Sequence, residues 1–210
     1  MRVKVKICGL TSVEEAKMLI EEKADFGGIV LFYEKSKRNC SLERAKKIVT
    51  ELKRAGIKSV AVVVSPTLSQ VREIEKIEFD HLQVHGELSE EVLRNTKLSI
   101  IRAVSYSNLE IMDALRMEEK IAGWLVDGVV PGAGKTFDWS LLKGIKRDQR
   151  LLFLAGGLTE ENVGEAVKAI APDVVDVSSG VEFERMEEIE KNGFRKNPKK
   201  IKQFISRAKA

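Results

Sequence analysis

Two hydrophobic periodicities alternate along the chain. Short runs rich in valine, isoleucine and leucine predict buried strands, and each is followed by a segment with apolar residues three or four positions apart, which predicts an amphipathic helix. Ser12 and Ser41 are expected to cap the first two helices, with Glu15 at the capping-box spacing from Ser12 and Gly56 near the end of the second helix. The predicted strands cover residues 3–8, 27–32, 59–64, 81–84, 98–104, 124–127, 151–155 and 174–178. The later helices are predicted at residues 68–77, 89–95, 109–117, 139–145, 159–170 and 198–208.

This alternation amounts to eight strand–helix units with no linker or low-complexity segment between them. Residues 57–64 form a nearly continuous aliphatic run, which is typical of a parallel strand covered on both faces. Eight such units favour a closed (β/α)8 TIM barrel, an α/β fold forming one domain over residues 1–210, with an open doubly wound sheet as the alternative. The polar, glycine-containing region 182–196 is interpreted as the last loop on the face that carries chemistry.

Composition narrows the class of protein. Hydrophobic residues make up 43% of the chain, and 36 basic against 32 acidic residues leave a net charge of only +4, which excludes a disordered chain. The basic residues are interleaved with acids, so a nucleic-acid partner is not expected. No apolar run could span a bilayer, the N-terminus lacks the core of a signal peptide, and two cysteines are too few for a disulfide scaffold. We therefore expect a cytoplasmic protein without membrane association, and the two histidines cannot form a zinc site alone.

In a barrel of this kind, functional residues follow the carboxyl ends of the strands. Cys8 ends the first predicted strand and Asp127 the sixth. Cys8 is either a small buried hydrophobe or a reactive thiol, and Asp127 is either a loop cap or a general acid or base. Their positions favour the catalytic interpretations.

Glycine-containing segments follow the last two strands. Gly156 and Gly157 come after the seventh strand, and Ser179 and Gly180 after the eighth. Glycines let backbone N–H groups approach an anion, and these two loops form the recurrent phosphate site of the fold, although simple turn chemistry is the alternative. Residues 131–136 resemble a P-loop, but the spacing of the glycines is wrong for one, so we interpret them as a flexible loop beside the active face.

Two further polar residues lie on predicted active-face loops. Arg38 follows the second strand within a basic run, where a guanidinium could bind a carboxylate through two hydrogen bonds. His85 follows the fourth strand and could either face a substrate or make structural hydrogen bonds. Cys40, Trp124 and Trp139 are interpreted as packing residues.

The first strand places lysines on its inner face. Its side chains alternate, with Val3, Val5 and Ile7 on one face and Lys4, Lys6 and Cys8 on the other. The aliphatic face suits the helices, so the lysines should point inward, where a buried ammonium needs a partner. Because closure places the eighth strand beside the first, we predict that Asp176 pairs with Lys4 or Lys6 as a structural ion pair.

Taken together, the strand-end segments resemble the phosphoribosylanthranilate isomerase family of tryptophan biosynthesis. The matching segments are residues 4–11, 32–38, 83–86, 127 with 134–139, 155–158 and 176–182, in order over essentially the whole chain. The chain departs from the family pattern at Glu34, where proline is common, at Asn39, where an aromatic residue is common, and in the loosely matching segment 193–197.

The resemblance implies an isomerase that converts N-(5-phosphoribosyl)anthranilate to 1-(2-carboxyphenylamino)-1-deoxyribulose 5-phosphate by an Amadori rearrangement. It implies Cys8 as general base and Asp127 as general acid, with Arg38 holding the anthranilate carboxylate. The backbone near Gly156, Gly157, Ser179 and Gly180 would bind the phosphate of the substrate. We also count His85 among the expected substrate-binding residues, with a structural role as its alternative. Neither a metal nor an organic cofactor is implied, and the chain would act as a monomer or homodimer.

Two other functions remain open on the sequence. Another phosphosugar barrel enzyme, such as an indole-glycerol-phosphate synthase or an epimerase, would share the phosphate loops. A non-catalytic anion- or RNA-binding protein would use the basic C-terminal helix, which carries Lys199, Lys200, Lys202, Arg207 and Lys209. The amphipathic spacing of that helix instead favours a solvated outer face.

Overall fold

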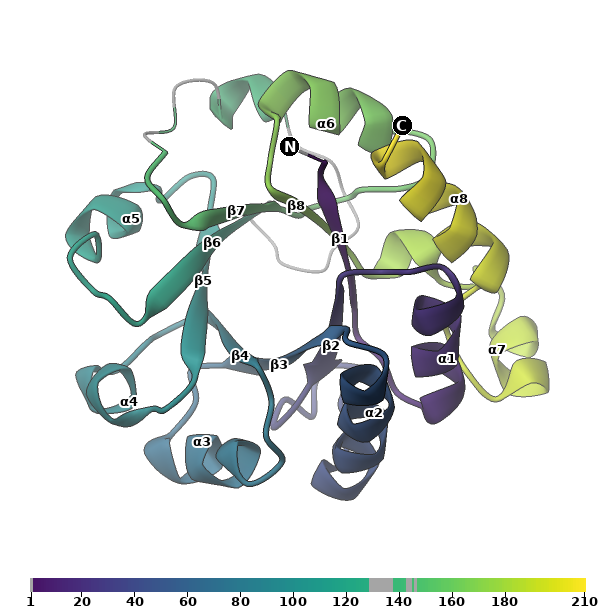
Figure 1. The fold of residues 1–210 in the computed structure, drawn as a ribbon, viewed down its shortest axis with the longest axis horizontal. Helices are drawn as coiled ribbons and strands as arrows, with labels where there is room; N and C mark the ends of the chain where they lie inside the picture. The colour runs from purple at the N-terminus through teal and green to yellow at the C-terminus, as the bar shows by residue number, and fades with distance from the viewer. Residues whose placement is uncertain (1, 129–137, 143–144, 146) are drawn as a thin grey trace.

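Eight parallel strands form a closed barrel in which each strand pairs with its neighbours in chain order and β8 pairs with β1 (Figure 1). The computed structural model describes residues 2–128, 138–142, 145 and 147–210. The strands are β1 (Lys4–Cys8), β2 (Phe26–Val30), β3 (Lys58–Val64), β4 (His81–His85), β5 (Ser99–Ser105), β6 (Ile121–Asp127), β7 (Leu151–Leu154) and β8 (Val174–Val177). The predicted barrel is confirmed, and the open-sheet alternative is wrong.

Helices surround the barrel on the outside (Figure 1). They are α1 (Val13–Glu21), α2 (Leu42–Arg54), α3 (Leu68–Glu75), α4 (Glu90–Asn95), α5 (Glu110–Ala114), α6 (Val163–Ile170), α7 (Met186–Asn192) and α8 (Pro198–Ala208), with 3-10 turns η1 (Trp139–Leu142) and η2 (Ser179–Val181). The hydroxyls of Ser12 and Ser41 accept hydrogen bonds from backbone N–H groups in the first turns of α1 and α2, as predicted. Helix α6 begins later than predicted, at Val163.

Two predictions near the C-terminus and at the first cap are wrong in detail. The region 182–196 is not only a loop, because it contains α7 and returns through an antiparallel bridge between Glu182 and Lys196. Glu15 does not bond back to Ser12 as in a capping box. Its carboxylate accepts hydrogen bonds from the backbone N–H of Thr11, Arg195 and Lys196, and so it ties the loop after β1 to the segment before α8.

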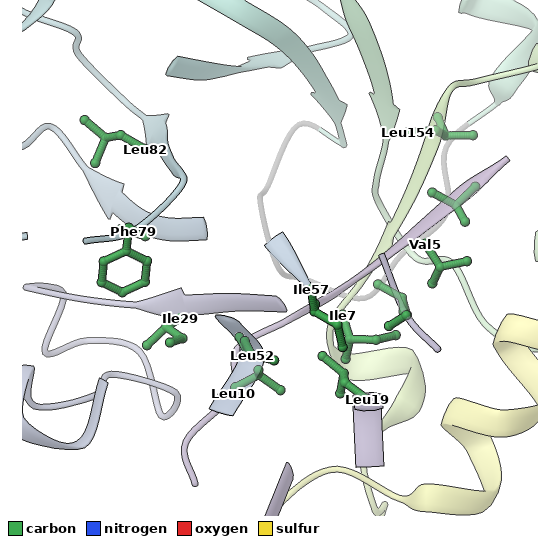
Figure 2. Close-up of a cluster of buried hydrophobic side chains, with 14 of the residues drawn as sticks. Val5, Ile7, Leu10, Leu19, Ile29, Leu52, Ile57, Phe79, Leu82 and Leu154 are labelled. Atoms are coloured by element: carbon green, nitrogen blue, oxygen red, sulfur yellow. The ribbon is translucent and has the colours of Figure 1, made fainter. Parts of the chain in front are cut away.

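The outer layer of the core lies between the strands and the helices. Figure 2 shows its part around β1, where Ile7, Leu10, Leu19 and Leu52 lie close together. Gly27 on β2 makes this packing possible, because a Cβ at this position would lie only 2.8 Å from the Leu52 side chain and 3.1 Å from that of Leu10. Helix α8 buries its predicted apolar face, with Ile201, Phe204, Ile205 and Ala208 all buried.

The barrel interior forms a second, smaller apolar layer. Phe26 and Phe153 meet edge to face there, with ring centroids 5.5 Å apart, and aliphatic residues of β3, β5 and β6 pack with them. These side chains fill the interior beneath the carboxyl ends of the strands. The polar residues at those ends therefore lie directly above a closely packed apolar layer.

The β1–β8 closure carries the predicted ion pair. Lys6 and Asp176 are register partners, and the Lys6 Nζ lies 2.9 Å from Oδ1 and 3.0 Å from Oδ2 of Asp176. The Lys6 side chain is completely buried, as the inward orientation predicts. Lys4, the other candidate, is exposed at the amino-terminal end of the strand, so the pairing belongs to Lys6.

Candidate active site

A cavity of about 500 Å³ opens at the carboxyl ends of the strands. Its walls bring together most of the residues that the sequence singled out, namely Cys8, Arg38, His85, Asp127, Gly156, Gly157 and Ser179, together with Asp176. Gly180 instead lines an adjacent cavity on the outer side of the same loops. Residues that follow the carboxyl ends of several different strands thus line one cavity, as expected for parallel strands of a barrel.

Cys8 ends β1 and is 9% exposed at the cavity wall. Burial raises the pKa of the Cys8 thiol, because a thiolate loses hydration there. The ammonium groups of Lys6 and Lys196 act in the opposite direction, whereas the carboxylate of Asp176 adds to the effect of burial. The thiol thus sits in a buried but strongly charged environment.

Asp127 ends β6 and reaches the cavity with 8% of its surface exposed. Its Oδ1 accepts a hydrogen bond of 2.7 Å from the backbone N–H of Gly128. Strands β1 and β6 are separated by β7 and β8 on one side of the ring and by β2 to β5 on the other. A ligand in the cavity can therefore contact Cys8 and Asp127 from different directions.

The loop after β7 has a backbone shape suited to an anion. Gly156 and Gly157 have φ values of +92° and +64°, in the region that L side chains rarely adopt. Asn162 braces this loop, because its side chain accepts a hydrogen bond from the Thr159 N–H and donates one to the Gly157 carbonyl. The loop after β8 packs directly against it, since a Cβ at Gly180 would lie 2.0 Å from the carbonyl oxygen of Leu158.

Arg38 lies in the loop after β2 and is engaged by a carboxylate of the protein itself. Its Nε and Nη2 lie 2.6 Å and 3.0 Å from the two oxygens of Glu182, in a forked ion pair. The Lys196 Nζ lies 3.0 Å from Glu182 Oε1 and also donates to the Ser178 carbonyl. Burial opposes the charge of Glu182, but Lys196 and Arg38 outweigh it and lower the pKa of Glu182 to about 2.

Glu182 and Lys196 were not among the predicted site residues. The sequence offered a signal for each, because Glu182 closes the family-like segment 176–182 and Lys196 lies in the segment 193–197. Interpreting 182–196 as a polar loop hid the pairing. It forms only because α7 brings the two positions back together.

His85 ends β4 and lies 2.8 Å from the side-chain amide nitrogen of Gln83 through its Nε2. Burial, with the positive charges of Lys6 and Arg102, lowers the pKa of His85 to about 4, so the imidazole is neutral at neutral pH. Arg102 on β5 donates to the carbonyls of Val84 and Gly86 and holds the turn that carries His85.

The remaining sequence predictions divide into two groups. Cys40 and Trp124 are buried in the outer layer and Trp139 packs against it, as predicted. The glycine loop 131–136 lies outside the described residues.

Within the described part of the chain, no cluster of three His, Cys, Asp or Glu side chains is placed to hold a metal ion. None of the helices described here has the length and apolar content needed to cross a bilayer.

The fold and this cavity define a class: a (β/α)8-barrel enzyme with ionisable groups and anion-suited loops at the carboxyl ends of its strands. The family model for N-(5'-phosphoribosyl)anthranilate (PRA) isomerase matches residues 5–207. The chain belongs to this family.

Individual relatives agree with the family match. The chain is 39% identical over 207 residues to the N-(5'-phosphoribosyl)anthranilate isomerase of Streptococcus mutans, covering 98% of both chains. It is 36% identical to that of Aquifex aeolicus, covering 99% of each. The crystal structure of phosphoribosyl anthranilate isomerase from Thermotoga maritima is similar with a TM-score of 0.82 at 37% identity, covering 99% of this chain and 98% of that one. A structure of the isomerase in complex with reduced 1-(o-carboxyphenylamino)-1-deoxyribulose 5-phosphate has a TM-score of 0.78 at 36% identity, covering 99% of this chain and 98% of that one.

Proposed function

We propose that this protein isomerises N-(5-phosphoribosyl)anthranilate to 1-(2-carboxyphenylamino)-1-deoxyribulose 5-phosphate in tryptophan biosynthesis, with Cys8 and Asp127 as its acid–base pair. The main support for these two roles is that both side chains line one cavity, together with the glycine loops suited to a phosphate. The bound reduced 1-(o-carboxyphenylamino)-1-deoxyribulose 5-phosphate in the structure of a related isomerase supports this choice of reaction.

The chemistry needs an acid and a base on one sugar. Asp127 donates its proton to the furanose ring oxygen as the C1–O bond breaks, which leaves a Schiff base between C1 and the anthranilate nitrogen. Cys8, as a thiolate, takes the C2 proton, and the C2–H electron pair moves toward the nitrogen to give an enolamine. C1 then gains a proton as the 2-hydroxyl loses one, which gives the ketone, and proton exchange returns Cys8 and Asp127 to their starting states.

The substrate would be held at its two charged ends. Backbone N–H groups at Gly156, Gly157, Ser179 and Gly180 would bind the phosphate. Arg38 would hold the anthranilate carboxylate, for which it must share or exchange its forked pairing with Glu182. Glu182 holds Arg38 at the cavity wall before substrate binds, so the guanidinium is already oriented for a carboxylate.

The proposal gives His85 the role of a neutral hydrogen-bonding group, which fits its lowered pKa of about 4 and its place on the cavity wall. It needs neither a metal nor an organic cofactor, because the substrate's own imine accepts the electrons. Both cysteines are free thiols, which suits a reducing cytoplasmic location. The proposed assembly is a monomer or a homodimer, and a Thermotoga maritima relative is described as dimeric.

The test mixes purified protein with freshly made phosphoribosylanthranilate and follows the loss of substrate fluorescence. Cys8→Ala and Asp127→Asn should each lower kcat by about 10²- to 10⁴-fold, the usual contribution of a positioned acid or base. Cys40→Ala is the matched control, because Cys40 is also buried but lies in the outer layer. Turnover by Cys8→Ala or Asp127→Asn at the level of Cys40→Ala would refute the assignment.

A further inference from the structure

A buried ammonium lies directly beneath the Cys8 thiol. Lys6 and Cys8 are the successive inward residues at the end of β1, and Gly28 of β2 is the register partner of Cys8. A Cβ at Gly28 would lie 3.1 Å from the Cys8 Sγ and 3.1 Å from the Lys6 Nζ. The two atoms are therefore at most twice that distance apart, and the missing side chain of Gly28 leaves the space that both occupy.

Asp176 fixes the ammonium in this position. Its two carboxylate oxygens accept hydrogen bonds from Lys6 Nζ at 2.9 Å and 3.0 Å. An ammonium has three N–H donors, so one remains after the two bonds to Asp176. The Lys6 ammonium acts to lower the pKa of the nearby Cys8 thiol, so the carboxylate, the ammonium and the thiol form one group of interacting side chains.

A purely structural ion pair would not need the thiol. Burying such a pair is costly, and apolar residues of similar volume are often as stabilising. Here the Lys6–Asp176 pair lies next to Cys8, whose reactive form is the thiolate anion. Burial alone disfavours that thiolate by raising the pKa of Cys8. The charged groups around the sulfur are Lys6 on β1, Asp176 on β8 and Lys196 before α8, while Asp127 on β6 and the neutral His85 on β4 line the same cavity.

We propose that Lys6 is a positioning residue for the isomerisation, in which its ammonium, held by Asp176, stabilises the Cys8 thiolate and fixes the sulfur at the cavity floor. This inference rests on the proposed role of Cys8 as general base. It assigns a chemical purpose to an ion pair that would otherwise only close the barrel.

The test titrates the Cys8 thiol directly in a Cys40→Ala background, by following the ultraviolet absorbance of the thiolate. Lys6→Met should raise the pKa of Cys8 and lower its thiolate fraction at neutral pH about tenfold or more, one pKa unit being a factor of ten. Asp176→Asn should shift that pKa in the opposite direction, because the ammonium then lacks its carboxylate and attracts the thiolate more strongly. Opposite shifts distinguish an electrostatic role from general damage to the fold.

Two further variants complete the design. Lys4→Met removes the same charge from the same strand at an exposed position and should leave the pKa of Cys8 unchanged. Lys6→Met/Asp176→Asn leaves no unpaired buried charge, so it provides the test if Lys6→Met does not fold. The double variant should still raise the pKa of Cys8, because the effect of Lys6 on the thiol exceeds that of Asp176.

Kinetics link the thiol to catalysis. The acid limb of the pH profile of kcat/KM should move with the titrated pKa of Cys8 in every variant that folds. An unchanged pKa of Cys8 in Lys6→Met or in the double variant would overturn the inference, as would shifts of the same sign in Lys6→Met and Asp176→Asn. The proposed function fails by a separate result, namely full turnover in Cys8→Ala.

Discussion

The two cysteines lie in different regions of the molecule. Both thiols are buried, but the charged side chains around them differ. Cys8 is 9% exposed and Cys40 is 4% exposed, and burial raises the pKa of both thiols. Cys40 belongs to the apolar outer layer between the barrel and its helices. Cys8 belongs to what we call the charged cluster, which comprises Lys6, Cys8, Arg38, Asp176, Glu182 and Lys196. Burial alone therefore does not identify a reactive thiol, whereas the charges placed around it do.

The largest effect on stability is expected from removing one charge of this cluster. Lys196→Met removes one of the three cationic partners of the buried Glu182, the others being Arg38 and the exposed Lys37. The cost is expected to approach the value of about 3–5 kcal/mol for breaking a buried pair. Urea unfolding measures the loss, and Lys199→Met, an exposed position three residues away, is the control. Equal stability of the two variants would mean that the cluster does not hold the region between β8 and α8 in place.

Acid should weaken the charged cluster before it affects the outer layer. The pKa of Glu182 is lowered to about 2 in the folded protein, so its ionised form contributes stability above the ordinary glutamate pKa. That contribution, on the order of 3 kcal/mol, is lost as the pH falls from about 5 toward 2. The free energy of unfolding of Glu182→Gln should vary less with pH over this window than that of the wild type. An identical slope in the two proteins would contradict the assigned ionisation.

The smallest effect is expected in the outer layer. Cys40→Ala removes one buried sulfur from an apolar environment and should cost about 1 kcal/mol of stability, typical of a modest core truncation. The pH profile of kcat/KM should be unchanged, because the side chain has no contact with the cavity. A shifted profile would show that the two regions are coupled and would weaken the contrast between the two thiols.

Local pattern was sufficient for the fold and for much of the site. Alternation along β1 predicted inward-pointing lysines, and barrel closure predicted that Asp176 pairs with Lys4 or Lys6. The structure assigns the pair to Lys6. The strand-end rule placed Cys8 and Asp127 on one cavity because parallel strands share their carboxyl ends. Each of these predictions needed only one strand and its neighbours.

The pairing of Glu182 with Arg38 and Lys196 could not be predicted in the same way. It depends on a return of the chain through α7, which the polar composition of residues 182–196 concealed. The same limit applies to Glu15, whose spacing indicated a local cap but whose carboxylate binds backbone N–H groups near the other end of the chain. Contacts between distant segments decide both cases, and local periodicity contains no information about them.

A crystal structure of this protein with reduced 1-(o-carboxyphenylamino)-1-deoxyribulose 5-phosphate would show whether Cys8 and Asp127 reach the same sugar. We expect the phosphate at the loops after β7 and β8, with the Cys8 Sγ about 3–3.5 Å from C2, the distance typical of groups poised to react. The Asp127 carboxylate should reach an oxygen of the same sugar chain. A ligand whose sugar lies beyond the reach of Cys8 or Asp127 would contradict this expectation.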